Sequence, residues 1–131
     1  MSNQLIDAYM NGRRDGMELY ELVKFNKLNE NIKKSGLLTT YIVNALKNNR
    51  FNPIDAYLRI NSIARFDVMI TIPEEEYLKK EFLEMFDVIS EIESSERDEL
   101  YNVFISFCSV NQYFDEQIVS SDGFVLKLEK I

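Results

Sequence analysis

The sequence predicts an α+β fold, in which N-terminal helices precede a β-α-β-β unit and the helices pack on one face of a small mixed sheet. The first observation is that apolar residues recur every three or four positions over much of residues 1–63, as in helices that bury one side. The second is a change of period to two beyond residue 64, which is typical of half-buried strands. The third is a long amphipathic helix between two of these strands, which lets them run parallel through a crossover connection.

Two amphipathic segments predict the first two helices. Residues 17–34 place Leu, Val, Phe and Ile side chains on one side and Glu and Lys side chains on the other. Residues 37–49 continue with the same helical spacing. Between them lies Ser35-Gly36, and glycine readily takes the left-handed conformation that ends helices. We therefore expect a helical hairpin that turns at Ser35-Gly36.

Residues 51–65 support two interpretations, a third helix and a strand. Asn52 suits the cap of a helix and Pro53 suits its first position, which favours the helix. Alternate positions are also apolar, as in a half-buried strand: Ala56, Leu58 and Ile60. We expect a helix here, and the choice between helix and strand over residues 53–64 stays open.

Three further segments predict the strands of the sheet. Residues 66–72 (FDVMITI) alternate apolar and polar positions, which indicates a half-buried strand. Residues 100–110 (LYNVFISFCSV) are apolar on both faces and rich in β-branched and aromatic side chains, as in a central strand. Residues 116–131 predict a closing hairpin, which turns at residues 121–123 (SDG) and adds an antiparallel edge, or a single closing strand.

The chain of 131 residues has the size of one domain. We treat residues 1–131 as a single domain, with a helical part over 1–63 and a β-α-β-β part over 64–131. The single cysteine rules out an internal disulfide, and the N-terminus lacks the basic start and long apolar run of a secretory signal. No segment approaches the roughly 18–20 apolar residues that span a bilayer. These features predict a cytoplasmic protein without membrane contact.

The composition excludes several kinds of site. The chain contains no histidine, which removes the usual acid–base group near neutral pH and the commonest zinc ligand. Its four glycines are scattered and form no phosphate-binding loop. Cys108 lies in an apolar strand, so without a histidine to activate its thiol we interpret it as a small buried hydrophobe. We therefore expect no catalytic residue, metal ligand or cofactor, and a histidine-free, metal-dependent enzyme is a minority alternative.

The long helix that follows Pro73 is expected to pack on the sheet. Its apolar side chains are three or four residues apart: Leu78, Phe82, Met85, Phe86, Ile89 and Ile92. Glu74, Glu75 and Glu76 fall in the first turn, where the helix dipole favours negative charge by about 0.3–1 kcal/mol each. This triplet has a purely structural explanation, because consecutive helical residues point about 100° apart and cannot converge on one metal ion.

A second group of carboxylates forms the candidate binding surface. Glu84, Asp87 and Glu91 are spaced by three and four residues and therefore share one side of the helix. More acids follow near the helix end, where negative charge opposes the dipole: Glu93, Glu96, Asp98 and Glu99. Folding alone would favour lysine there, so we expect the stripe to meet a basic surface on a partner or on the protein's own N-terminal half. The alternative is a solvated face that only keeps the protein soluble.

The charge distribution is uneven, which supports an electrostatic contact. Residues 1–63 contain nine Lys/Arg and six Asp/Glu, a net charge of +3. Residues 64–131 contain six Lys/Arg and sixteen Asp/Glu, a net charge of −10. The pI of about 4.7 implies long-range repulsion of phosphate, which disfavours nucleic acid as the partner.

Tyr113 and Phe114 lie beside two acids in a predicted loop, residues 110–117. Loop aromatics often anchor protein contacts, because they bury a large area at a small entropic cost. The same side chains can equally fold back as a lid over the edge of the sheet. Both interpretations stay open.

The predicted function is that of a small acidic protein-binding module, which acts as a regulator, adaptor or inhibitor of a partner with a basic surface. The expected contact residues are Glu84, Asp87, Glu91, Tyr113 and Phe114. Electrostatic steering would bring the partner in, and the aromatic side chains would prolong the contact. The alternative from another class is a self-associating structural protein, a homo-oligomer in which the acidic stripe of one copy docks on the basic helices of the next.

Overall fold

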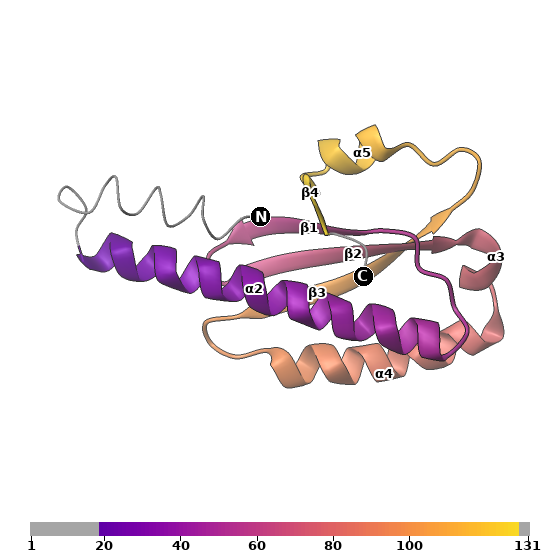
Figure 1. Cartoon of the computed structure of the whole chain (residues 1–131), viewed down its shortest axis with the longest axis horizontal. Helices are drawn as coiled ribbons and strands as arrows, with labels where there is room; N and C mark the ends of the chain where they lie inside the picture. Colours follow the sequence, from indigo (N-terminus) through magenta and orange to yellow (C-terminus); the bar gives the residue numbers. More distant parts are fainter. Residues whose placement is uncertain (1–18, 129–131) are drawn as a thin grey trace.

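The computed structural model describes residues 19–128, which form an α+β fold (Figure 1). The first described element is one long helix, α2 (Leu19–Asn48). The elements that follow are β1 (Ala56–Ser62), β2 (Arg65–Pro73), α3 (Glu74–Tyr77), α4 (Lys80–Glu96), β3 (Asn102–Val110), α5 (Glu116–Ser121) and β4 (Leu126–Leu128). The predicted fold class is confirmed.

The four strands form one mixed sheet in the order β3-β2-β1-β4. β1 and β2 are an antiparallel hairpin with Leu58 opposite Val68, and β4 pairs antiparallel with the start of β1. β3 runs parallel to β2, as the predicted crossover through the acidic helix requires, with Phe107 opposite Ile70. The predicted parallel pair is therefore confirmed. The hairpin partner of β2 is β1, whose residues the sequence leaves undecided between helix and strand.

The main core lies between the sheet and the two long helices, α2 and α4, which run side by side on the same face (Figure 1). α2 contributes Leu38, Ile42 and Leu46, and α4 contributes Phe82, Met85 and Ile89. The strands contribute alternate side chains, including Leu58, Phe66, Val68, Ile70, Ile72 and Val103. A smaller cluster on the opposite face joins Tyr57 to Val119 and Phe124, so that α5 covers that side.

α2 runs without interruption through Ser35-Gly36, so the predicted helical hairpin is wrong. Ser35 is fully buried, and its hydroxyl lies 2.8 Å from the hydroxyl of Tyr101 in a hydrogen bond. The Thr39 hydroxyl donates to the carbonyl oxygen of Ser35 at 2.7 Å, and the Thr40 hydroxyl to that of Gly36 at 3.0 Å. Packing and these polar contacts outweigh the helix-propensity cost of one glycine, which is about 1 kcal/mol.

Replacing Gly36 with alanine is expected to stabilise the protein by about 0.5–1 kcal/mol, because Gly36 sits inside a helix and alanine restricts the unfolded chain. A Cβ atom built on Gly36 would meet no atom within 4 Å, so the methyl group has room. Urea unfolding followed by circular dichroism measures the change. If the variant were instead less stable, Gly36 would occupy a left-handed helix end and the helix would break there.

Residues 56–62 form strand β1, so the helix expected over residues 51–65 is wrong. Asn52 caps no helix here; its backbone N–H and side-chain amide donate to the carboxylate of Glu76, at 2.6 and 3.1 Å. The backbone N–H of Ile54 donates to the carbonyl oxygen of Thr71 at 2.8 Å, which begins the pairing with β2. The alternation of apolar residues was therefore the correct signal. The hydrogen bonds to β2 select the strand over the helix.

β3 is an edge strand, which corrects the prediction of a central one. α4 protects the first half of that edge, because Glu93 accepts a hydrogen bond from the backbone N–H of Ile105 at 2.8 Å. Arg97 donates to the carbonyl oxygen of Val103 at 3.2 Å. The ring of Phe104 on the other face lies 4.4 Å from the Arg97 guanidinium carbon. Side-chain cover of this kind limits unwanted pairing with other strands.

The chain closes with the single strand β4, and the alternative of a hairpin is wrong, because its first arm is the short helix α5. Asp115 caps α5, since its carboxylate accepts a hydrogen bond from the backbone N–H of Gln117 at 2.9 Å. The chain then turns at Gly123, whose φ of +93° favours glycine, and enters β4. Within residues 19–128, no helix has both the length and the apolar character needed to cross a lipid bilayer.

Candidate functional site

The candidate surface is the outer side of α4, where the three predicted carboxylates lie. Phe82, Met85 and Ile89 are at most 5% exposed and face the sheet. Glu84, Asp87 and Glu91 are all exposed. Because each helical residue is rotated by about 100° from the last, these acids point away from the core on the opposite side of α4. The structure therefore brings them together on one surface.

The three carboxylates of this acidic stripe (Glu84, Asp87 and Glu91) make no hydrogen bond or ion pair with the side chains and backbone of residues 19–128. Other acids of the same region do have partners. Glu76 is buried and accepts the two hydrogen bonds from Asn52. Glu93 pairs with Arg97, one helical turn later. The unpaired state of the stripe thus distinguishes it from the acids that hold the fold together.

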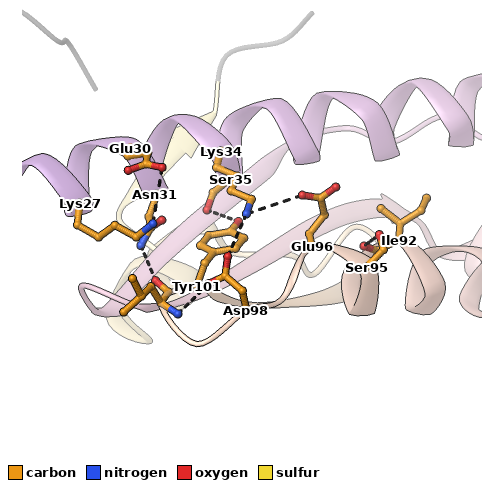
Figure 2. Close-up of polar contacts among 11 residues, drawn as sticks. Lys27, Glu30, Asn31, Lys34, Ser35, Ile92, Ser95, Glu96, Asp98 and Tyr101 are labelled. Atoms are coloured by element: carbon orange, nitrogen blue, oxygen red, sulfur yellow. Dashed lines mark hydrogen bonds and ion pairs between the residues drawn. The ribbon is translucent and has the colours of Figure 1, made fainter.

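The acids at the end of α4 are bound by α2, as Figure 2 shows. The Lys34 ammonium lies 4.0 Å from Glu96 and 3.8 Å from Asp98. It also lies 4.6 Å from the centre of the Tyr101 ring. The expected docking of acids on the protein's own basic half therefore occurs at Glu96 and Asp98, within the described residues, and leaves the stripe free.

A groove of about 380 Å³ runs between α2 and α4 beside the stripe. Its lining residues are Lys34, Leu37, Leu38, Tyr41, Ile92, Ser95 and Glu96. Leu37 is 74% exposed and Tyr41 is 62% exposed, although both are large apolar groups. On α4, Leu83 and Val88 flank the stripe and are also exposed. Exposed apolar side chains gathered beside unpaired charges are typical of a protein contact surface.

The two loop aromatics lie on the other side of the molecule. They precede α5, which covers the opposite face of the sheet from α4 (Figure 1). Tyr113 is 80% exposed, whereas Phe114 is half-buried against the cluster of Tyr57, Val119 and Phe124. The structure thus places Tyr113 and Phe114 away from the acidic stripe, with Phe114 folded back as a lid and Tyr113 free to make contacts.

Two further cavities were not anticipated from the sequence. The larger, about 540 Å³, lies between α2 and the segment that enters β1, and its lining includes Val43, Ile54 and Leu128. The smaller, about 300 Å³, lies beneath the loop aromatics and includes Cys108 and Phe124. Cys108, which was interpreted as a small buried hydrophobe, is only partly buried. Residues from distant segments line both cavities, and periodicity along the chain carries no signal for such sites.

A polar network lies on the face of the sheet that α5 covers. The Tyr57 hydroxyl donates to the Glu116 carboxylate at 3.1 Å. The Lys127 ammonium lies 3.4 Å from Glu116 and 3.5 Å from Asp55. Burial and, to a lesser extent, the hydrogen bond to Glu116 raise the pKa of Tyr57 to about 12. The network joins β1, α5 and β4, and its charged groups hold these elements together.

This raised pKa predicts a loss of stability at alkaline pH. The ordinary pKa of tyrosine is 10.0, so above that pH the unfolded chain releases the proton that folded Tyr57 keeps up to about pH 12. The free energy of unfolding should therefore fall as the pH rises from 10 towards 12. Urea unfolding at about pH 9 and pH 11 should show a smaller fall in Tyr57→Phe than in the unchanged protein. Equal falls in the two proteins would contradict the assignment, because burial raises the pKa of Tyr101 in both.

Within residues 19–128, no three Cys, Asp or Glu side chains are arranged so that they could hold a metal ion. Comparisons of the chain with protein-family models, with curated proteins and with solved structures gave no significant match. We therefore infer the function from the surface of α4 and from its surroundings.

Proposed function

We propose that this protein is an acidic protein-binding module, a regulator, adaptor or inhibitor in the cytoplasm that recognises a basic surface on its partner. The observation that carries the proposal is the acidic stripe, in which Glu84, Asp87 and Glu91 are exposed and unpaired with respect to residues 19–128. Like charges one turn apart on a helix are destabilising by about 0.2–0.5 kcal/mol per pair. Positive charges on a bound partner would offset this repulsion between the carboxylates.

The recognition mechanism combines charge and apolar contact. The net charge of −7 and the outward direction of the stripe attract a basic partner and raise the association rate. Leu83 and Val88, which are 62% and 46% exposed, flank the stripe and lose contact with water in the complex. This apolar contact slows dissociation, and dissociation rates account for most differences in affinity between related complexes. Tyr113 is proposed as a separate contact, because it lies on the opposite face of the sheet.

Reversing the charge of the stripe tests the proposal. The tagged protein is incubated with native lysate at low salt, and the proteins released by rising salt are identified by mass spectrometry. For a captured basic partner, the variant Glu84→Lys/Asp87→Lys/Glu91→Lys should bind at least about tenfold more weakly, with a smaller dependence on salt. Recovery of further copies of the same chain would contradict a separate partner and favour self-association.

A matched variant controls for net charge. Glu21→Lys/Glu30→Lys/Glu75→Lys reverses three exposed acids on other parts of the surface. In both variants three reversals add two charges each, which changes the net charge from −7 to −1. The proposal requires the control to keep its affinity to within about twofold. An equal loss in both variants would mean that the partner senses only net charge, and the assignment to α4 would be wrong.

A further inference from the structure

We infer that the partner presents an amphipathic helix that lies in the groove between α2 and α4, with its basic residues along the flank that faces α4. This inference rests on the proposed function and adds the groove, the anchoring side chains and the form of the partner. The α2–α4 groove is defined by the seven lining residues given above.

The walls of the groove are two helices that are fixed by the same core. Figure 2 shows Ile92 and Ser95 on α4, on the side nearest to α2. The Ser95 hydroxyl donates to the carbonyl oxygen of Ile92 at 2.8 Å, so its O–H needs no acceptor from a partner. Lys34 and Glu96 join the two helices across the groove at 4.0 Å. The groove is therefore formed before binding, which lowers the cost of association.

The exposed apolar side chains suit a helix as the occupant. Leu37 and Tyr41 are one turn apart on α2. On α4, Ile92 lines the groove, and Val88 lies one turn before it, outside the lining, and is 46% exposed. Two rows of apolar side chains at this spacing match the rows that an amphipathic helix offers at positions i, i+4 and i+7. Each side chain that the occupant covers adds apolar area removed from water.

The charges around the groove determine which sign of charge the occupant carries and on which flank. On α4 the wall leads to Glu84, Asp87 and Glu91, which are unpaired with respect to the described residues. On α2, Lys34 is neutralised by Glu96 and Asp98. Lys33 is exposed one turn before Leu37, so positive charge on the occupant is favourable only towards α4. An acidic helix would meet like charge along α4 and is excluded from this groove.

A designed peptide tests this inference directly. The probe is a helical peptide of about 15 residues with leucines at helical spacing and lysines along one flank. One control peptide carries glutamate in place of each lysine, and a second has the same composition in scrambled order. We expect the lysine peptide to bind and to shift the backbone NMR signals of Leu37, Tyr41 and Ile92, and we expect neither control to bind. Binding of the scrambled peptide with equal affinity, or no binding of the lysine peptide, would overturn the inference.

Comparing a groove variant with the charge reversal of the stripe separates the two parts of the surface. Leu37→Ser/Tyr41→Ser removes the anchors and should raise the dissociation constant of the lysine peptide at least about tenfold at both low and high salt. Ile118→Ser removes a side chain on α5 that is 62% exposed, and it should leave the affinity unchanged. A loss of binding only on charge reversal of the stripe would retain the proposed function and overturn the groove. A loss only in the groove variant would overturn the role of the stripe.

Discussion

Phe82→Ala is expected to lower the free energy of unfolding by about 3–5 kcal/mol, because it removes a fully buried aromatic side chain and leaves a cavity. Phe82 is 0% exposed and stands at the centre of an aromatic cluster. Its ring centre lies within 5.1–5.5 Å of those of Phe51, Tyr77, Phe86 and Phe107. These residues come from α3, α4, β3 and the segment before β1, so the cavity would weaken contacts between all of them. The loss is a large part of the 5–15 kcal/mol typical of a domain.

The neighbouring residue gives the control for this prediction. Leu83 lies on the same helix and is 62% exposed, so Leu83→Ala should change stability by less than about 0.5 kcal/mol. Urea unfolding followed by circular dichroism measures both variants, and the denaturant dependence shows whether each unfolds in one transition. Equal losses at the two positions would contradict the assigned orientation of α4, on which the position of the acidic stripe also depends.

Asn31→Leu is expected to destabilise the protein by about 2–4 kcal/mol, although leucine is apolar and similar in size. Asn31 is 0% exposed, and its side-chain amide donates to the carbonyl oxygens of Ile63 at 2.8 Å and Leu100 at 3.0 Å. Figure 2 shows Asn31 pointing from α2 towards this region near Tyr101. Leucine would take this donor away from two partly buried carbonyls, and a buried polar group without a partner costs about 1–3 kcal/mol. Part of this loss is offset, because leucine also removes the Asn31 Oδ1 atom, which is buried without a hydrogen-bond partner among the described residues.

The matched change is Asn44→Leu, at an exposed position on the same helix. It should alter the free energy of unfolding by less than about 0.5 kcal/mol. Amide hydrogen exchange should also show weaker protection near Ile63 and Leu100 in Asn31→Leu, because that side chain joins α2 to both loops. Unchanged stability in Asn31→Leu would mean that α2 is held by its apolar contacts alone.

Several elements could be predicted from the sequence because their signals are local. The alternation through residues 66–72 predicted β2, and the three- and four-residue spacing in the following segment predicted α4. The single helix expected after Pro73 is divided into α3 and α4, and Leu78 between them is 73% exposed instead of facing the core. The same spacing placed Glu84, Asp87 and Glu91 on one side of α4, and the structure has them there. In each case the residues that carry the signal are close in the chain. β2 is nevertheless an interior strand buried on both faces, with Asp67 7% and Thr71 1% exposed, so the prediction that it is only half-buried is wrong.

Other elements depended on partners that lie far away in the sequence. Ser35-Gly36 has the local character of a helix end, yet contacts with Tyr101 keep α2 continuous. Residues 56–62 fit a helix or a strand, and the hydrogen bonds of β2 decide for the strand. Asn31 and Ser35 gave no signal as core residues, because hydrophobic periodicity does not register a polar side chain that is buried and hydrogen-bonded.

By itself the sequence determined the α+β class, the parallel pair of strands and the amphipathic character of α4, since these follow from the order and period of apolar residues. The tertiary structure alone decided which acids are free. Glu96 and Asp98 meet Lys34, whereas Glu84, Asp87 and Glu91 meet no cation of the described residues. It also placed Tyr113 near Val119 and Phe124, on the face of the sheet that α5 covers. The physical reason is that charge pairing and the separation of surfaces depend on distances across the fold, which spacing along a chain does not specify.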